Sequence, residues 1–140
     1  KLSEMTARAK RYKLPLSLLM FDVDHFKAYN DTRGHLTGNR VLERVGRVVS
    51  EEIREVDWGF RYGGDEFTVV LPETSKKDAT IVAERIRKAV EKCKFDETTL
   101  SIGVAQYDLK SDFDILIKYA DEAMYKAKNQ GGNRTKIHGV

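Results

Sequence analysis

An almost continuous apolar run, LSLLMFDV at Leu16–Val23, sets the strongest constraint on how this 140-residue chain can fold. Its length is that of a strand, and its lack of alternation is typical of a strand that is buried on both faces. The run therefore predicts a sheet that other elements cover. Its polar end carries two acids, Asp22 and Asp24.

Patterns in the rest of the chain predict further helices and strands. Helices are expected near residues 1–13, 24–32, 38–53, 75–92 and 111–127, and strands at 16–23, 57–62, 66–71, 99–107 and 134–138. Ser111 and Asp114 resemble a capping box at the start of the last helix, and Asp24 is expected to be a helix N-cap rather than a metal ligand. The order α-β-α-α-β-β-α-β-α-β indicates an α+β or α/β domain.

Composition narrows the class of protein. The length suits one domain, and 41% hydrophobic with 34% charged residues is an ordinary globular composition. The net charge of +3 comes from 25 basic and 22 acidic residues that are mixed along the chain, and no apolar run approaches the ~20 residues of a membrane span. The single Cys93 fits a reducing compartment. We expect a cytoplasmic domain that contacts neither DNA, RNA nor a membrane.

The stretch RYGGDEF at residues 61–67 places two glycines beside two carboxylates, at the tip of a predicted hairpin. No phosphate loop, dinucleotide fingerprint, zinc motif or paired cysteine is present. Carboxylates converging from this hairpin and from the end of the apolar strand could hold Mg²⁺ for nucleotide chemistry. On spacing alone, solvated acids after an ordinary turn remain the alternative.

Four segments in order resemble the GGDEF domain family, the diguanylate cyclases: FDVDHFKAYNDTRGH, RYGGDEF, SIGVA and YADEAMYKAKNQGGN. The resemblance runs from about Leu16 to the C-terminus. It implies a central five-stranded, mostly antiparallel sheet surrounded by helices, an α/β sandwich similar to nucleotide cyclase and polymerase palm domains. It also implies a bacterial signalling enzyme that condenses two GTP into cyclic di-GMP and two pyrophosphates across a homodimer.

The resemblance implies a role for individual residues as well. Asp65 and Glu66 would be the catalytic acids, and Glu66 would bind metal or help to deprotonate the 3′-hydroxyl. Two Mg²⁺ ions, or Mn²⁺ in their place, would be held by Asp22, the Val23 carbonyl, Asp65 and Glu66. The groups that bind GTP would be His25, Phe26, Lys27, Asn30, Asn39, Gly63, Gly64 and Lys128. Of these, the start of the helix at His25 and the two lysines would hold phosphates, and Asn30 would hold guanine.

A second site is implied upstream of the hairpin. Arg54-x-x-Asp57 stands at the spacing of the family's inhibitory R-x-x-D motif, and Arg85 falls where the family often places another product-binding arginine. Arginine pairs bidentately with phosphate or with the O6 and N7 edge of guanine. These three residues would bind cyclic di-GMP and inhibit by feedback.

The chain departs from the family pattern at two positions of the active site. Asn39 stands where the family usually has aspartate, and Gly132 stands where it commonly has arginine to the triphosphate; Arg134 is the candidate replacement. These departures leave open an alternative: a catalytically degenerate domain that binds GTP or cyclic di-GMP and signals through contacts.

The family's usual opening motif, D-x-L-T-G-L-x-N-R, is absent from the start of the chain. We therefore expect residues 1–140 to form a single catalytic domain that lacks this motif and an upstream regulatory region, as part of a larger sensor protein.

Overall fold

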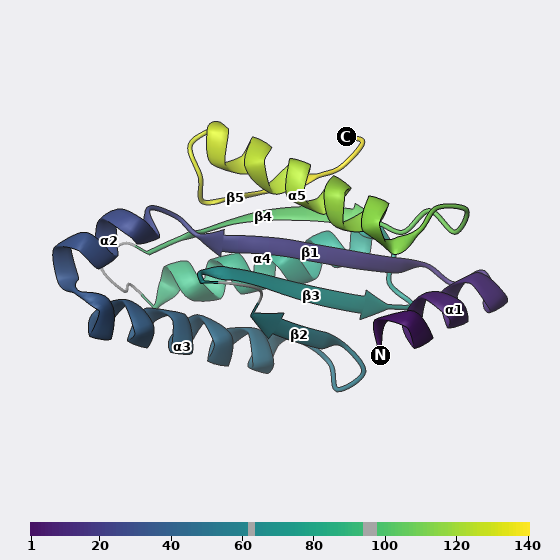
Figure 1. Cartoon of the computed structure of the whole chain (residues 1–140), viewed down its shortest axis with the longest axis horizontal. Coiled ribbons are helices and arrows are strands. Elements are labelled where there is room, and N and C mark those ends of the chain that lie inside the picture. The colour runs from purple at the N-terminus through teal and green to yellow at the C-terminus, as the bar shows by residue number, and fades with distance from the viewer. Residues whose placement is uncertain (62–63, 94–97) are drawn as a thin grey trace.

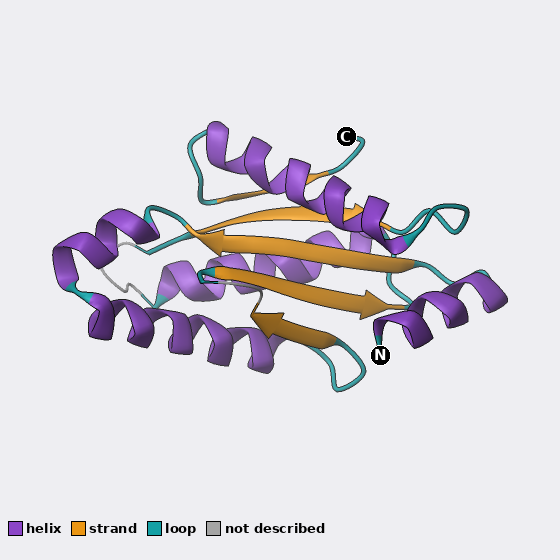
Figure 2. Cartoon of the chain, viewed as in Figure 1, coloured by secondary structure: helices purple, strands orange, loops and turns teal. Residues whose placement is uncertain are grey.

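Strand β1 (Leu16–Val23) occupies the middle of a five-stranded sheet in the computed structural model, which describes residues 1–61, 64–93 and 98–140. The strand order is β2-β3-β1-β4-β5, and all eight residues of β1 are buried. Helices cover both faces of the sheet (Figure 2). The prediction of a strand buried on both faces is confirmed.

The sheet is antiparallel except at one edge. β3 (Glu66–Pro72) and β4 (Leu100–Gln106) both run antiparallel to β1, and β2 (Trp58–Arg61) pairs antiparallel with β3 as a hairpin. β5 (Arg134–Ile137) pairs parallel with β4 at the far edge. The expected α+β fold with a five-stranded, mostly antiparallel sheet is confirmed.

Side chains of β1 alternate between two apolar layers. Leu19 and Phe21 pack in the layer formed with α3 (His35–Glu52) and α4 (Lys76–Lys92). Leu18 and Met20 pack in the layer formed with α1 (Leu2–Tyr12) and α5 (Phe113–Asn129). The alternation continues to the end of the strand, so that Asp22 lies on the α5 side of the sheet.

The end of β1 leads directly into α2 (Phe26–Arg33), which lies at one end of the sheet (Figure 1). The next helix begins at His35, three residues before the expected start near Gly38, because its first turn is mostly exposed and shows no apolar period. Gly34, with φ of 87°, separates the two helices. No helix formed by the residues in the described ranges is long and apolar enough to cross a membrane.

The start of α5 corrects the predicted capping box. The helix begins at Phe113, and its N-cap is Asp112, whose side chain accepts a hydrogen bond from the Ile115 N–H. The Ser111 hydroxyl instead donates to the Asp108 carboxylate in the preceding turn. The prediction of Ser111 as the cap was wrong by one residue, because two neighbouring side chains can both cap and only the turn geometry selects one.

Gly103 allows α5 to lie unusually close to β4. A Cβ atom built on Gly103 would overlap the backbone carbonyl of Ala120 and the backbone N–H of Met124, both in α5. Backbone atoms in the middle of a helix cannot move aside singly. The glycine is therefore required by the packing of the helix on the sheet.

We expect Gly103→Ala to lower the free energy of unfolding by about 2–3 kcal/mol, because the added methyl group over-packs a rigid contact. Chemical denaturation monitored by circular dichroism measures the change. Gly46→Ala is the matched control: among the described residues a Cβ there meets only the Phe67 ring, at 3.9 Å, and alanine in a helix should stabilise by about 0.5 kcal/mol. Equal stabilities of Gly103→Ala and the parent would contradict the packing argument.

Candidate functional site

The predicted acidic residues meet at one end of the sheet. Asp22 and Glu66 lie directly opposite each other in the β1–β3 register, and Asp65 precedes Glu66 in the turn that begins β3. The last turn of α5 and the start of α2 lie at the same end (Figure 1). The fold thus brings together carboxylates that are more than 40 residues apart in the sequence.

Asp22 is a buried carboxylate, and one of its oxygens has no partner in the described part of the chain. Its side chain Oδ2 accepts a salt bridge from Lys128 Nζ at 2.7 Å, while Oδ1 is buried and has no partner among the described residues. Burial raises the pKa of Asp22 to about 6, against the lowering effect of Lys128. A buried oxygen without a partner is costly, and a bound cation would satisfy it.

The pKa values of two further groups at the site, Glu66 and Lys128, are also raised. Burial, followed by the charges of Asp121 and Asp65, raises the pKa of Glu66. Burial acts to lower the pKa of Lys128, but its hydrogen bond to Asp22 and the nearby carboxylates raise that pKa overall. Negative charge is therefore concentrated here, and a fixed lysine stands beside it. The described residues contain no group of three or more His, Cys, Asp or Glu placed to hold a metal ion by themselves.

The start of α2 faces this end of the sheet. His25 precedes the helix in a left-handed conformation, with φ of 56°, and both His25 and Lys27 are exposed, while Phe26 packs partly against the core. The first N–H groups of a helix have no partner within it, and they favour anions. The predicted phosphate-binding residues thus stand at a helix N-terminus next to Asp22.

Asn30 depends on a glycine that the sequence analysis did not single out. Its Nδ2 lies 3.3 Å from His35 Nδ1, and its Oδ1 is buried without a partner among the described residues. A Cβ atom on Gly38 would collide with this oxygen. An isolated glycine inside a helical pattern was the available signal. Asn39, the next residue, is exposed on α3.

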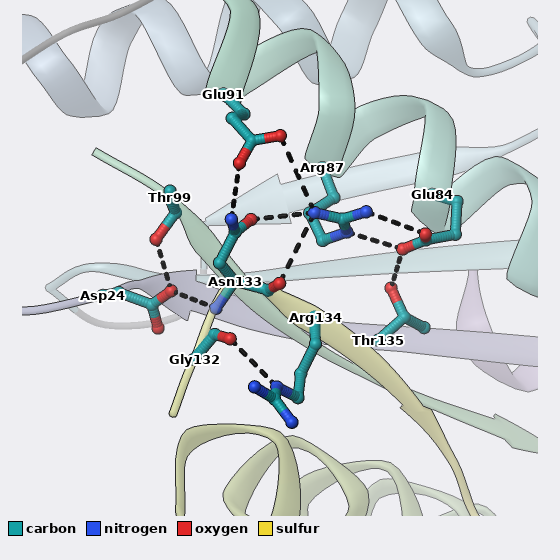
Figure 3. Close-up of polar contacts among 9 residues, drawn as sticks. All are labelled: Asp24, Glu84, Arg87, Glu91, Thr99, Gly132, Asn133, Arg134 and Thr135. Carbon is teal, nitrogen blue, oxygen red and sulfur yellow. Dashed lines mark hydrogen bonds and ion pairs between the residues drawn. The ribbon is translucent and has the colours of Figure 1, made fainter. Parts of the chain in front are cut away.

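Asp24 is not a helix N-cap, so that prediction was wrong. Its backbone N–H donates to the Thr99 carbonyl, and this bond holds it beside β4. Its carboxylate accepts from Thr99 Oγ1 at 2.7 Å and from the backbone N–H of Asn133 at 2.8 Å (Figure 3). It also accepts from Ser101 Oγ at 2.5 Å. The carboxylate points across the sheet toward β4 and β5, and His25 takes the N-cap position without a side-chain hydrogen bond.

The side chain of Asn133 is bound on its other side by α4. Its Oδ1 accepts from Arg87 Nη1 at 2.8 Å, and its Nδ2 donates to Glu91 at 2.5 Å. Arg87 also forms a two-pronged ion pair with Glu84, which accepts a further hydrogen bond from Thr135 (Figure 3). The Arg87 hydrogen bond lowers the pKa of Glu84 to about 2. We call Asp24, Asn133, Arg87, Glu84 and Glu91 the Asn133 network.

Gly132, the departure near the C-terminus, lies in the turn that this network holds, and its candidate replacement Arg134 begins β5. Gly132 has φ of 73°, and a Cβ atom built on it would lie 2.9 Å from Asp24 Oδ2. Arg134 Nε donates to the Gly132 carbonyl at 3.0 Å, so this arginine folds back on the turn (Figure 3). Gly64 is exposed, and a Cβ atom built on it would meet no described atom within 4 Å, while Gly63 lies outside the described residues.

The three residues of the predicted second site border one hollow of about 300 Å³. Arg54 forms an ion pair with the buried Asp57 at 2.7 Å and also donates to the Pro72 carbonyl and to Thr74. Arg85 reaches the same hollow from α4 and contacts Glu52. The hollow presents two half-exposed guanidinium groups beside the buried carboxylate of Asp57, and Glu73 and Asp78 line it as well.

Comparison with known proteins gives one consistent family. The family model described as "Diguanylate cyclase, GGDEF domain" matches residues 1–134. Diguanylate cyclase DosC of Escherichia coli is 45% identical in an alignment of 138 residues that covers 94% of this chain and 30% of the relative. Diguanylate cyclase A of Treponema denticola is 45% identical in an alignment of 133 residues that covers 89% of this chain and 36% of the relative. The chain thus spans about a third of the length of these curated relatives.

Solved structures agree in fold. The active GGEEF domain of a diguanylate cyclase from Vibrio cholerae has a TM-score of 0.92 at 33% identity, covering 98% of this chain and 91% of that one. The GGDEF domain of DgcB from Caulobacter crescentus, in complex with c-di-GMP, has a TM-score of 0.93 at 29% identity, covering 99% of this chain and 84% of that one.

Glu84 should make the stability of the domain depend on acid pH. The pKa of Glu84 is about 2 in the folded state and near 4.5 in the unfolded chain. Its contribution to the free energy of unfolding is therefore complete above about pH 4.5 and is lost as the pH falls through about 2. Its side chain is 34% exposed, so after discounting for solvent screening we expect Glu84→Gln to cost about 1 kcal/mol near pH 7 and little near pH 2.

Urea denaturation at both pH values measures this difference. Glu51→Gln, a change at an exposed position of α3, is the matched control and should leave the pH dependence as in the parent. A constant cost of Glu84→Gln across the acid range would show that the ion pair with Arg87 adds no stability.

Proposed function

The chain belongs to the GGDEF domain family, and on this premise we propose that it is the catalytic domain of a diguanylate cyclase, which condenses two GTP into cyclic di-GMP and two pyrophosphates. The observation that carries the proposal is the pairing of Asp22 opposite Glu66, with a buried Asp22 oxygen that lacks a partner among the described residues and with Lys128 beside it. These parts suit phosphoryl transfer, which depends on positioning and on charge stabilisation.

The residues present fit a divalent cation. Asp22, the Val23 carbonyl, Asp65 and Glu66 would hold Mg²⁺, or Mn²⁺ in its place, and two ions per site is the number that the family implies. Mg²⁺ prefers one or two carboxylates together with substrate phosphates, in agreement with the small number of acids here. When bound, such an ion neutralises charge on the phosphates and lowers the pKa of the attacking hydroxyl.

The substrate contacts follow from the elements around Asp22. The N-terminus of α2, at His25 and Phe26, together with Lys27 and Lys128, supplies positive charge and free N–H groups for the β- and γ-phosphates. Asn30 would hydrogen-bond guanine, and Gly38 supports this role because it leaves room for the Asn30 amide. Asn39 offers guanine one acceptor and two donors, whereas an aspartate offers acceptors only. Gly63 and Gly64 would let the nucleotide lie against the hairpin.

The reaction requires two copies of the domain. Each would hold one GTP, and the 3′-hydroxyl of one nucleotide would attack the α-phosphorus of the other, forming a P–O bond while pyrophosphate leaves. Glu66 is suited to accept the hydroxyl proton, because burial and neighbouring acids raise its pKa. A homodimer with the two sites facing each other would form both bonds of the product.

The hollow bordered by Arg54, Asp57 and Arg85 would bind the product. Guanidinium groups pair with phosphate or with the guanine edge, and a carboxylate accepts from guanine N–H groups. Residues of β3 and of α4 line the hollow, which lies on the α4 side of the sheet, opposite to the α5 side that carries Asp22. Cyclic di-GMP bound there would inhibit by feedback without competing directly for the site of GTP.

We expect the domain at high concentration to convert GTP and Mg²⁺ into cyclic di-GMP, detected by chromatography. Asp65→Ala and Glu66→Ala should each lower the rate about 100-fold or more, since they remove a metal ligand or the proton acceptor. Asp114→Asn, at an exposed position in the first turn of α5, is the control and should keep the parent rate.

Dilution alone can silence a dimeric enzyme, so the same assay is repeated with a dimerising coiled coil fused before Lys1. Product from the fused parent and none from its Glu66→Ala variant supports the cyclase. Tight binding of GTP with no product from the fused parent would overturn the proposal in favour of a degenerate nucleotide-binding domain.

Feedback inhibition is tested best at Arg85. Arg54→Ala would leave the buried Asp57 without its ion pair, whereas Arg85 is half exposed and contacts Glu52. We expect Arg85→Ala to weaken cyclic di-GMP binding about tenfold, the loss of one charge-assisted contact, and to relieve inhibition while leaving the initial rate unchanged. Calorimetry and rates with added product measure both effects.

Arg47→Ala, which removes an exposed arginine of α3 outside the hollow, is the matched control. Unchanged inhibition in both Arg85→Ala and Arg54→Ala would show that cyclic di-GMP does not act at this hollow.

A further inference from the structure

We infer that Asp24 is a positioning residue: its carboxylate fixes the Gly132–Asn133 turn to the end of β1, and thereby holds Lys128 at Asp22 and the start of α2 beside them. The inference rests on the proposed function, because it concerns the same site. It assigns a role to the second acid of Asp22-Val23-Asp24, which the sequence analysis predicted to be a helix N-cap.

The surroundings of the carboxylate define its task. Oδ1 accepts from Ser101, and Oδ2 accepts from both Thr99 and the Asn133 N–H. Three short hydrogen bonds, from β4, from the residue that precedes it and from the turn before β5, engage both oxygens of Asp24. Asp22 instead keeps a buried oxygen without a partner in the described structure. Asp22 therefore has an oxygen available to a cation, whereas both oxygens of Asp24 already accept hydrogen bonds from the protein.

Three contacts connect the end of β1, the last turn of α5 and the turn that follows α5. The Asn133 N–H binds Asp24, the neighbouring Gly132 N–H binds the Ala127 carbonyl in the last turn of α5, and the next residue, Lys128, binds Asp22. Asp22 and Asp24 are joined through Val23. The end of β1 is thus tied at Asp22 to the last turn of α5 and at Asp24 to the turn that follows α5, so that losing one tie gives the other more freedom.

The turn is held from its outer side as well. Arg87 and Glu91 of α4 bind the Asn133 side chain, and only 13% of the Arg87 side chain is exposed. Asn133 has φ of 47°, a conformation that asparagine tolerates better than most residues. Anchors on both sides define one position for the turn, as a positioning role requires.

Gly132 belongs to the same arrangement. A Cβ atom there would lie 2.9 Å from Asp24 Oδ2 and 3.0 Å from its Cγ, so the carboxylate packs against the bare backbone of the turn. A side chain at this position would have to shift either the turn or Asp24. The glycine therefore fits the close tie in this chain.

The consequence for the reaction concerns Lys128. A cation bound at the other Asp22 oxygen would neutralise the carboxylate that holds Lys128, and the lysine would then be free to meet phosphate. The tie through Asp24 keeps the last turn of α5 in place during this exchange. Loss of this tie should therefore weaken the binding of GTP more than it weakens the binding of the metal ion.

The test compares Asp24→Ala with Asp24→Asn. Asparagine keeps an oxygen that can accept from both the Asn133 N–H and the Thr99 hydroxyl, and the Ser101 hydroxyl can turn to accept from its amide. We expect Asp24→Ala to raise the KM for GTP about tenfold or more, the loss of hydrogen bonds to a charged group, and Asp24→Asn to restore most of it. The Mg²⁺ concentration for half-maximal rate should stay near the parent value in both, with Asp114→Asn as control.

Hydrogen exchange of the protein without nucleotide or metal gives a readout independent of activity. The Asn133 amide should exchange about tenfold or more faster in Asp24→Ala than in the parent, and close to the parent rate in Asp24→Asn. The His138 amide, bound to the Val104 carbonyl in the same strand region, is the internal reference and should not change. If the parent makes no cyclic di-GMP, the proposed function fails while this arm still tests the tie.

A second variant keeps the charge in place. Thr99→Val with Ser101→Ala removes both hydroxyl donors and leaves Asp24 intact, so we expect faster exchange at Asn133 and a raised KM with an unchanged Mg²⁺ requirement. This double variant tests the positioning role of Asp24 if Asp24→Ala does not fold.

Three results would overturn the inference. One is a raised Mg²⁺ requirement in both Asp24→Ala and Asp24→Asn, which would make Asp24 a metal ligand. Another is unchanged Asn133 exchange and KM in Asp24→Ala and in the double variant. The last is faster exchange at Asn133 and His138 alike with an unchanged KM, which would make the contact purely stabilising.

Discussion

A carboxylate buried at the end of the central strand is the constraint on which the rest of this structure depends. Asp22 continues a strand whose residues are all buried, and it therefore cannot be solvated as a surface acid is. Burial raises its pKa, Lys128 compensates one oxygen, and the other oxygen has no partner among the described residues. A site that is costly in the free protein is ready for a cation, because binding removes the cost.

The elements around Asp22 are placed by the two layers that cover the sheet. Alternation along β1 directs Asp22 to the α5 side, where Lys128 stands, and the antiparallel register sets Glu66 opposite. Close approach of α5 through Gly103 fixes that helix on β4. The opposite layer contains α4, whose Arg85 borders the hollow of the proposed product site and whose Arg87 binds the Asn133 turn. One helix thus contacts the surroundings of both proposed sites.

Much of the fold was predictable because it rests on local patterns. The buried run at Leu16–Val23, the pairing of β2 with β3 and the apolar periods of the helices are properties of short segments, and the structure confirms them. The errors lie where two local solutions compete. Ser111 and Asp112 can both cap α5, and Asp24 can either cap α2 or accept from β4 and the Asn133 turn. Gly38 was overlooked because its neighbour Asn30 comes from another helix.

The sequence by itself determined the family resemblance, the order of elements and the residue types that phosphoryl transfer needs, because motifs and periodicity are written in neighbouring residues. Only the tertiary structure decided which acid is available to a cation and which is already bound. That distinction depends on donors from Thr99, Ser101 and Asn133, which lie 75 or more positions from Asp24 along the chain. Partners so distant in sequence are chosen by strand order and helix packing, and these are set by the burial of the whole core.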